Sequence, residues 1–248
     1  MADIKTAFHI GCGNCGLQKI CFPTGLVKSD VDRLDMIVDR KPALKKGQHL
    51  YQVGDKFQSL FAIRAGVVKL YEITDSGEEV IHGFYLPGDV LGMDGVENKT
   101  HQFSASALDS LSICSLPFDQ LNDLSLQVPN LHNQILKVMS KEANESRLHT
   151  DLLMKKSADQ RMAQFIFGMS ERYRERGYVY DSFRLAILHR DVALYLGLTP
   201  ETVSRILAKM HSDGIASWKK KEVQIMDRDA LMALAGIIVD RDEKKQKA

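Results

Sequence analysis

The sequence predicts an α+β protein with an N-terminal β-jelly roll, one long helix and a C-terminal winged helix-turn-helix domain. Short apolar runs between turn signals recur from residue 42 to 118, as in small barrels and jelly rolls. From Pro129 to about Met154 the apolar residues have helical spacing. Near Gly197 two short helical segments meet, and two strand-like runs follow them. These observations indicate a β domain and a helical domain joined by the long helix.

Length, composition and charge set the broad class. The chain has 248 residues, of which 44% are hydrophobic and 26% charged, which suits one large or two ordinary globular domains. No apolar run approaches the roughly 18 residues that span a bilayer, and no secretory signal is visible, so we expect a cytoplasmic protein without a membrane partner. Residues 1–154 hold 15 basic and 19 acidic side chains, whereas residues 155–225 hold 13 and 8. The basic second part is a modest indication of nucleic-acid binding.

The N-terminal half begins with an irregular segment and continues as strands. Residues 1–25 are rich in glycine and cysteine and have little periodicity. The stretch Ser29–Arg40 has helical spacing, and Ser29 is expected to be its N-cap. Three later runs have the composition of strands and lie between turn signals: Leu60–Ile63, Val67–Ile73 and Val80–Tyr85.

The long helix has a stripe of residues close to coiled-coil spacing. The stripe consists of Leu136, Met139, Ala143, Thr150 and Leu153, with Arg147 or Ser146 filling its gap. Because the stripe is interrupted by polar residues and has few leucines, it predicts weak self-association. A helix of about 24 residues must bury such a stripe somewhere, so the alternative is that it faces the core of its own domain.

The segment after residue 190 has the pattern of a helix-turn-helix. A first helix is expected over Asp191–Tyr195. Gly197 suits the sharp turn after it, because glycine adopts positive φ cheaply. Thr199 is the predicted N-cap of the second helix, and Pro200 suits its first position, where an N–H group is not needed.

The second helix separates into a buried and an outward face. The buried positions are Val203, Ile206, Leu207 and Met210. The residues expected to contact DNA are Thr199, Glu201, Thr202, Ser204, Arg205 and Lys209. Arginine pairs with guanine O6 and N7, glutamate accepts from cytosine N4, and serine serves either partner. Helix-turn-helix proteins place the first turns of this helix against base edges, so the pattern predicts binding to double-stranded DNA. A helical hairpin with a solvated basic turn is the alternative.

Flanking segments complete this domain. One helical face begins after Ala158 and consists of Met162, Phe165, Ile166 and Met169. The stretch Phe183–Ile187 is predicted to be a strand. Two further strands, Ile215–Trp218 and Val223–Ile225, are joined by the lysines at 219–221, in the manner of a wing that contacts phosphates.

Three of the four cysteines lie within ten residues, with the spacing Cys12-x₂-Cys15-x₅-Cys21. Disulfides are not expected in a reducing cytosol, so metal or redox chemistry is the natural inference. The fourth, Cys114, lies in a predicted strand. Four thiolates suit tetrahedral zinc or a four-iron cluster, and His9 could instead complete a Cys₃His zinc site. The spacing alone leaves an iron–sulfur cluster, zinc and inert cysteines open.

Three motifs are similar to those of one known family. Leu60–Gly66 and Pro87–Asp89 are similar to its sensor-domain pattern, and Glu201–Arg205 is similar to its DNA-reading motif, Glu-x-x-Ser-Arg. On these motifs the chain resembles the fumarate and nitrate reduction regulators of the CRP/FNR superfamily of transcription factors. The resemblance extends from about Cys12 to Gly236.

The resemblance implies four parts. They are a cluster-binding segment at 1–28, a β-jelly-roll sensor domain at 29–128, a dimerisation helix at 129–156 and a winged helix-turn-helix DNA-binding domain at 157–248.

The resemblance also implies an oxygen-controlled switch rather than an enzyme. The four cysteines would bind an oxygen-labile [4Fe–4S] cluster, and the intact cluster would favour a homodimer on palindromic operator DNA that activates or represses anaerobic-metabolism genes. RNA polymerase would be a further partner, contacted near Thr74–Glu79, including Gly77 and Glu78.

Three rival functions share parts of the pattern. Cyclic-nucleotide binders of this fold have a Gly-Glu pair and then an arginine beside a small hydroxyl residue. Here Met93 follows Gly92, and Phe103-Ser104 stands where arginine is expected, so a phosphate lacks its partner. A cupin-type enzyme needs a closely spaced histidine pair, which Asp94 and His101 do not provide. A zinc-binding or thiol-redox DNA-binding regulator of the same fold remains the alternative.

Overall fold

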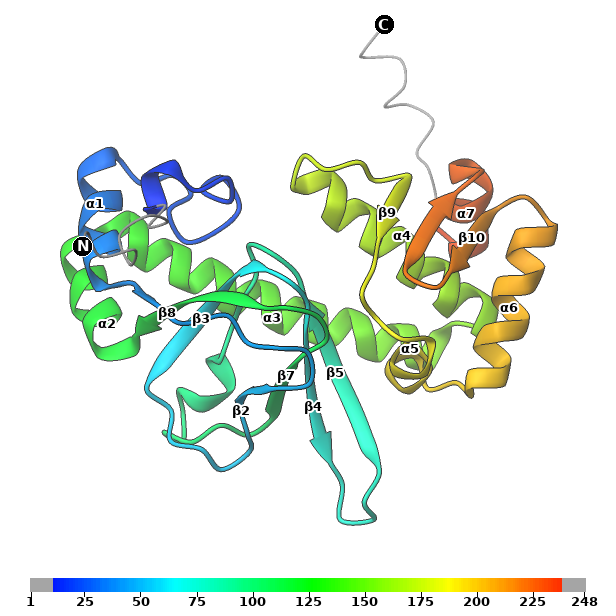
Figure 1. The fold of residues 1–248 in the computed structure, drawn as a ribbon, viewed down its shortest axis with the longest axis horizontal. Coiled ribbons are helices and arrows are strands. Elements are labelled where there is room, and N and C mark those ends of the chain that lie inside the picture. Colours follow the sequence, from blue (N-terminus) through cyan, green and yellow to red (C-terminus); the bar gives the residue numbers. More distant parts are fainter. Residues whose placement is uncertain (1–10, 238–248) are drawn as a thin grey trace, which may run out of the picture. The chain divides into compact units, whose positions relative to one another are not determined.

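The computed structural model describes residues 11–237 (Figure 1). The chain divides into two compact units, Met1–Glu145 and Ser146–Ala248. The division falls inside the longest helix, α3 (Pro129–Lys155), which the sequence predicted almost to the residue. Within residues 11–237, no helix has the length and apolar character needed to cross a membrane.

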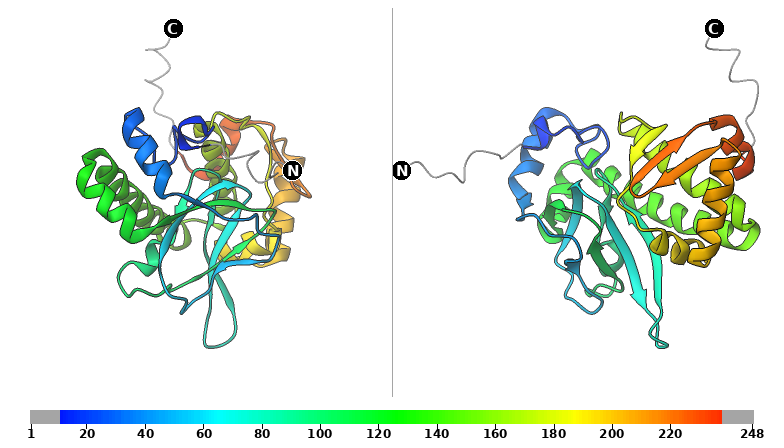
Figure 2. Two further views of the ribbon diagram at one scale, coloured as in Figure 1. Left: turned by 60° about the vertical axis from the view of Figure 1, so that its left-hand side comes forward. Right: turned by 45° about the vertical axis from the view of Figure 1, so that its right-hand side comes forward.

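The first unit contains two four-stranded antiparallel sheets (Figures 1 and 2). Their strand orders are β1-β8-β3-β6 and β2-β7-β4-β5. The bounds are β1 Asp39–Arg40, β2 His49–Tyr51, β3 Ser59–Ala65, β4 Val68–Ile73, β5 Glu79–Tyr85, β6 Val90–Leu91, β7 Ser104–Ala107 and β8 Ser112–Pro117. The three strands predicted from their composition are confirmed as β3, β4 and β5, and the β-sandwich agrees with the predicted fold class.

Strand β3 is apolar on both faces because both faces are covered. Leu60 and Ala62 belong to a core that also includes residues of the three helices of this unit, α1 (Lys28–Ile37), α2 (Phe118–Gln127) and α3. Ile63 belongs instead to the core between the two sheets. Strand β8 follows the same alternation, since successive side chains point to opposite faces. Ile113 lies between the sheets, and Cys114 packs against the helix-side core.

The predicted N-cap of α1 is wrong. The helix begins at Lys28, and its N-cap residue is Val27, which makes no side-chain capping bond. The carbonyl of Val27 already accepts the backbone amides of Asp30 and Val31, both at 3.0 Å. Helical hydrogen bonding therefore starts before Ser29, which lies inside the first turn.

The second unit is a winged helix-turn-helix domain (Figure 2). Its elements after α3 are α4 Ala158–Glu175, β9 Ser182–Arg184, α5 His189–Leu196, α6 Pro200–Ser212, β10 Ala216–Lys219, β11 Glu222–Ile225 and α7 Arg228–Ala235. The sheet has the order β10-β11-β9, and α4 packs against α5, α6 and α7. The predicted buried face of α4 is confirmed: Met162, Phe165, Ile166 and Met169 are all buried.

The strand predicted over Phe183–Ile187 is shorter than expected. Its pairing with β11 ends at Arg184, opposite Glu222. Leu185 and Ile187 are still buried, and the amide of Leu185 donates to the carbonyl of Lys221 at 2.7 Å. These residues are apolar because they are buried, and apolar runs of this length resemble strands. The prediction was therefore too long, since β11 pairs only as far as Arg184.

Candidate functional site

The turn between α5 and α6 has the predicted local chemistry. Gly197 ends α5 in the left-handed conformation, with φ of 60°. The side chain of Thr199 accepts the backbone amide of Thr202 at 3.2 Å and so caps α6, with Pro200 as its first residue. Each of these three predictions is confirmed.

Helix α6 has the predicted buried and exposed faces. Val203, Ile206, Leu207 and Met210 are buried. The exposed face comprises Glu201, Ser204, Arg205, Ala208 and Lys209, and Thr202 is partly buried beside it. Most of the residues expected to contact DNA are therefore exposed on one helix, and the contact itself stays a prediction.

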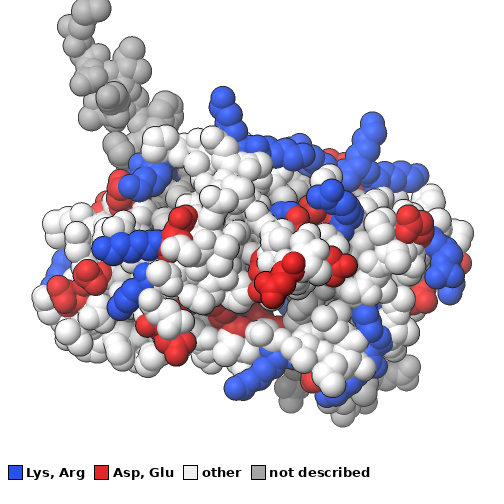
Figure 3. Space-filling view, turned by 90° about the horizontal axis from the view of Figure 1, so that it is seen from below, with Lys and Arg blue, Asp and Glu red and all other residues white. Residues whose placement is uncertain are grey.

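The β10–β11 hairpin, here called the wing, follows α6. The two strands pair in register from Ala216 with Ile225 to Lys219 with Glu222. Lys220 at the turn has φ of 57°, an uncommon conformation for a residue other than glycine. On the face shown in Figure 3, both basic and acidic side chains are exposed, and several basic ones gather along its upper edge.

All four cysteines meet at one cavity in the first unit. Cys12, Cys15, Cys21 and Cys114 line it together. All four are free thiols and partly buried. The rest of the lining is mostly apolar and includes Leu17, Phe22, Pro23, Leu34, Val38 and Leu116. The structure thus brings together the three clustered cysteines and the distant Cys114, while His9 lies outside the described residues.

Asp35 of α1 holds the first cysteine in place. One of its carboxylate oxygens accepts the backbone amide of Cys12 at 2.8 Å and also pairs with Arg40. Arg40 lies in β1 directly opposite Cys114 in β8. Burial acts to raise the pKa of Asp35, but the hydrogen bonds from Cys12 and Arg40 outweigh it and hold that pKa below its usual value. Sequence reasoning missed both Asp35 and Arg40.

Three of the four thiols, those of Cys12, Cys21 and Cys114, lie in surroundings that disfavour their charged form. Burial raises the pKa of Cys21 to about 12. Burial, then the hydrogen bond to Asp35, raises the pKa of Cys12 to about 12. Burial also raises the pKa of Cys114, although Arg64 acts against it. Metal binding at this cavity must therefore displace protons from these three thiols.

Four thiols are a donor set for soft metals, bound either as one zinc ion or as an iron–sulfur cluster. Within residues 11–237, no three His, Cys, Asp or Glu side chains form a group that could hold one metal ion. A tetrahedral zinc draws four thiolates to about 2.3 Å from a single point. A [4Fe–4S] cluster instead takes each thiolate on a different iron, so its ligands surround a volume. The shared cavity shows that the four thiols lie close together, and it suits either arrangement.

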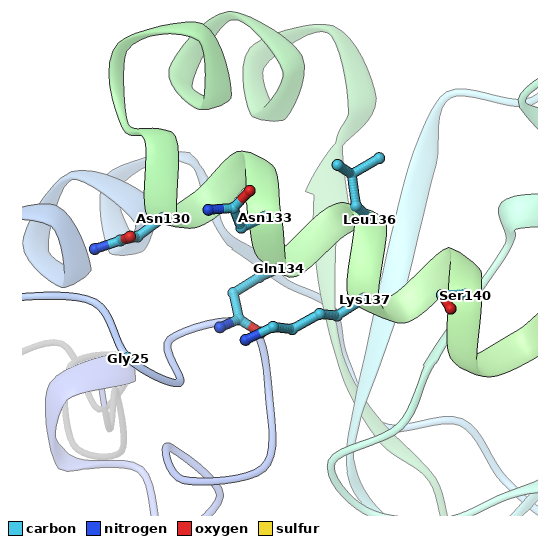
Figure 4. A pocket seen from close by; sticks show the side chains of 7 residues that line it. All are labelled: Gly25, Asn130, Asn133, Gln134, Leu136, Lys137 and Ser140. Carbon is cyan, nitrogen blue, oxygen red and sulfur yellow. The ribbon is translucent and has the colours of Figure 1, made fainter.

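The cysteine segment, residues 11–26, contacts α3 and the β-sandwich of the first unit. The side-chain amide of Gln134 in α3 donates to the carbonyl of Thr24 at 2.7 Å. In Figure 4, the side chain of Gln134 extends toward the loop that contains Gly25, whereas the side chain of Leu136 points away from that loop. On another side the segment packs tightly on Gly88, where a Cβ atom would lie 2.6 Å from Ile20. No local sequence signal marks Gln134.

Two family models match the two units. The family described as "Cyclic nucleotide-binding domain" matches residues 42–127, and "Crp-like helix-turn-helix domain" matches residues 160–234. Among solved structures, FixK2 from Bradyrhizobium japonicum has a TM-score of 0.73 at 26% identity, covering 80% of this chain and 97% of that chain.

Curated relatives match nearly the whole chain. It is 44% identical to the transcriptional activator protein anr of Pseudomonas aeruginosa over 225 residues, which are 91% of this chain and 92% of that protein. It is 41% identical to the fumarate and nitrate reduction regulatory protein of Escherichia coli K12 over 227 residues, 92% and 91% of the two chains. The chain therefore belongs to the family of fumarate and nitrate reduction regulators, transcription regulators with a Crp-like helix-turn-helix.

Proposed function

We propose that this chain is an oxygen-responsive transcription regulator whose Cys12, Cys15, Cys21 and Cys114 bind a [4Fe–4S] cluster. The strongest support is that these four cysteines, one of them far along the sequence, line one cavity. When bound, the cluster would supply an oxygen-reactive group, because its sulfides and thiolates are oxidisable. The protein's part is to release the four thiol protons, to hold Cys12 through Asp35 and to surround the group with apolar side chains.

Dimerisation through α3 is the second part of the proposal. The inner face of α3 packs against the core of the first unit through Leu131, Ile135 and Val138. The outer face includes the predicted seam of Leu136, Met139, Ala143, Arg147, Thr150 and Leu153, of which all but the partly buried Leu153 are exposed. One apolar stripe thus faces the protein's own core, and a second copy would cover the other.

The cysteine segment is well placed to control that dimer. Beside it, a groove of about 470 Å³ runs along α3 and is lined by Gly25, Asn130, Asn133, Gln134, Leu136, Lys137 and Ser140 (Figure 4). Gln134 joins the segment to α3, and Leu136 belongs to the proposed seam. A weak seam can be switched by a small change in free energy, which a rearranged cysteine segment would supply.

Operator DNA and RNA polymerase complete the proposal. Two copies would present Glu201, Ser204 and Arg205 to two half-sites of palindromic DNA in the cytoplasm, with Thr199, Thr202 and Lys209 at the edges of the contact. Gly77 and Glu78 are exposed at the tip of the β4–β5 hairpin and are the proposed polymerase contact.

We do not expect the β-sandwich of the first unit to bind a cyclic nucleotide. Asp94 accepts the backbone amides of Gln102 and Phe103, at 2.9 and 3.2 Å. Glu142 of α3 accepts the hydroxyl of Tyr85 at 3.1 Å. The carboxylate of Asp94 would repel a phosphate placed near it, and the arginine of nucleotide-binding proteins of this fold is missing.

Metal analysis of anaerobically purified protein tests the proposal. About four irons and four acid-labile sulfides per chain are expected, with sedimentation as a dimer and operator binding. Air should remove the sulfide, halve the sedimenting mass and release the DNA. Each Cys→Ser variant should lose the iron, whereas Arg205→Ala should keep it. Zinc without sulfide would establish the zinc-binding alternative, and an unchanged mass in air would refute the switch.

A further inference from the structure

The carbonyl groups at the end of α5 have partners from outside that helix. A helix leaves its last four carbonyls without intrahelical donors, and buried ones need another partner. The carbonyls of Ala193 and Leu194 accept amides of the following turn. Those of Tyr195 and Leu196, the last two residues of the helix, accept side chains of two other helices.

Arg161 of α4 is the partner of Leu196. The backbone donor four residues after Leu196 would be Pro200, which has no N–H group. Nη1 of Arg161 donates to the Leu196 carbonyl at 3.0 Å instead. The same guanidinium donates to the carbonyls of Lys156 at 3.0 Å and Leu153 at 2.5 Å. One cation therefore caps the C-terminal ends of both α3 and α5, where a positive charge is favoured.

His149 of α3 is the partner of Tyr195. Its Nε2 lies 2.8 Å from the Tyr195 carbonyl, so this nitrogen bears the donated proton. The two rings also stack, with centroids 4.0 Å apart and planes at 4°. The last turns of α3 are thus joined to the end of α5 by a direct hydrogen bond as well as through Arg161.

We propose that His149 and Arg161 are positioning residues that lock the recognition helix α6 to the C-terminal turns of α3. Both act on the carbonyls that directly precede Gly197, the turn from which α6 starts. If two copies pair along α3, as the proposed function holds, the lock sets the spacing and angle of the two recognition helices. Neither residue lies on α6, so their effect is on the geometry of binding rather than on base contacts.

The first test compares Arg161→Met and Arg161→Lys with Arg174→Met. Arg174 lies on the same helix and pairs with Glu171, so its variant controls for the loss of one charge. Affinities of the anaerobically loaded full-length proteins are measured on an operator, on operators with half-site spacing changed by one base pair, and on random DNA at the same salt concentration.

Arg161→Met should weaken operator binding by about tenfold relative to Arg174→Met and should flatten the spacing preference. Binding to random DNA should match the control, because charge dominates there. Arg161→Lys should recover part of the loss. Equal weakening on operator and random DNA, or a loss of iron or of dimer mass in Arg161→Lys, would overturn the lock.

His149 allows the hydrogen bond to be separated from the stacking. His149→Gln keeps an amide donor without the ring, and His149→Phe keeps the ring without a donor. The lock predicts that His149→Gln retains both the ratio of operator affinity to random-DNA affinity and the spacing preference, and that His149→Phe loses both. The reverse order of the two variants would refute the lock. Wild-type protein without iron would instead refute the proposed cluster, and the operator-over-random ratio of these variants still tests the lock.

Discussion

The backbone amide of Cys12 donates to a carboxylate oxygen of Asp35 at 2.8 Å, so helix α1 holds the first cysteine of the segment. Asp35 also pairs with Arg40, which lies opposite Cys114 across the β1–β8 pair. One carboxylate therefore connects the cysteine segment, α1 and the sheet on three sides of the cavity. The position of Cys12 relative to Cys114 depends on it.

Asp35→Ala should impair cluster assembly without unfolding the domain. The change leaves the Cys12 amide without its acceptor and Arg40 without its partner, at a local cost of about 1–3 kcal/mol. We expect fewer irons and sulfides per chain and a shorter lifetime of the cluster absorbance in air. Asp32→Ala, an exposed site on the same helix, is the control. Equal iron content and equal lifetime in the two variants would contradict the role of Asp35.

The sequence predicted best what depends on neighbouring residues. The turn between α5 and α6 was predictable because Gly197, Thr199 and Pro200 each act within a few residues. Asp35 and Gln134 were not, because their hydrogen-bond partners lie 23 and 110 residues away and no periodic pattern links them.

Two local predictions failed for related reasons. Serine is a favoured N-cap residue, but the helix starts before Ser29, because the carbonyl of Val27 already accepts helical hydrogen bonds. Phe183–Ile187 has the composition of a strand, but a strand ends where its partner does, and that partner is chosen by the fold. The spacing of the cysteines left cluster and zinc equal, and the meeting of all four at one cavity was not predictable because Cys114 lies 93 residues after Cys21.

Glu142 should make stability depend on pH. Burial raises its pKa above the usual value, although the hydrogen bond from Tyr85 acts against this. A raised carboxyl pKa means that the folded state binds the proton more tightly. Its stabilising effect is therefore complete below the unfolded pKa of about 4.3 and is lost as the pH rises through the folded pKa.

Glu142→Gln removes that dependence, because glutamine still accepts from Tyr85 and does not ionise. The difference in thermal midpoint between variant and wild type should grow in favour of the variant from pH 5 to pH 8. Each kcal/mol corresponds to about 2–4 °C for a chain of this size. Asp151→Asn, an exposed change on the same helix, tests whether the loss of charge alone is responsible. A difference that is constant with pH would exclude the role of Glu142.

Arg205 should determine sequence preference at one base pair. Arg205→Ala removes a bidentate donor and should cost about 1–3 kcal/mol on the matched operator, with relaxed preference at a single position. Lys209→Ala removes a charge from the same exposed face and should weaken all sequences alike, with the salt slope lowered by about 1. Competition binding against operators with single substitutions distinguishes the two. If Arg205→Ala weakened matched and mismatched operators equally, the arginine would not read a base.

Lys220→Gly should separate the stability of the wing from its contribution to DNA binding. Lys220 has φ of 57°, which costs a residue with a Cβ atom about 1–2 kcal/mol relative to the right-handed region and costs glycine little. Because glycine also loses more freedom on folding, we expect a net gain of roughly 0.5–1 kcal/mol and a higher thermal midpoint.

The variant also lacks a charge expected to lie near a phosphate, so its affinity for every sequence should fall, and the salt slope should fall by about 1. Lys219→Gly, in the extended strand β10, loses the same charge without relief of strain, so its midpoint should fall instead. A lower midpoint in both variants would mean that the backbone at Lys220 is not strained, and an unchanged salt slope would mean that the wing does not approach the DNA backbone.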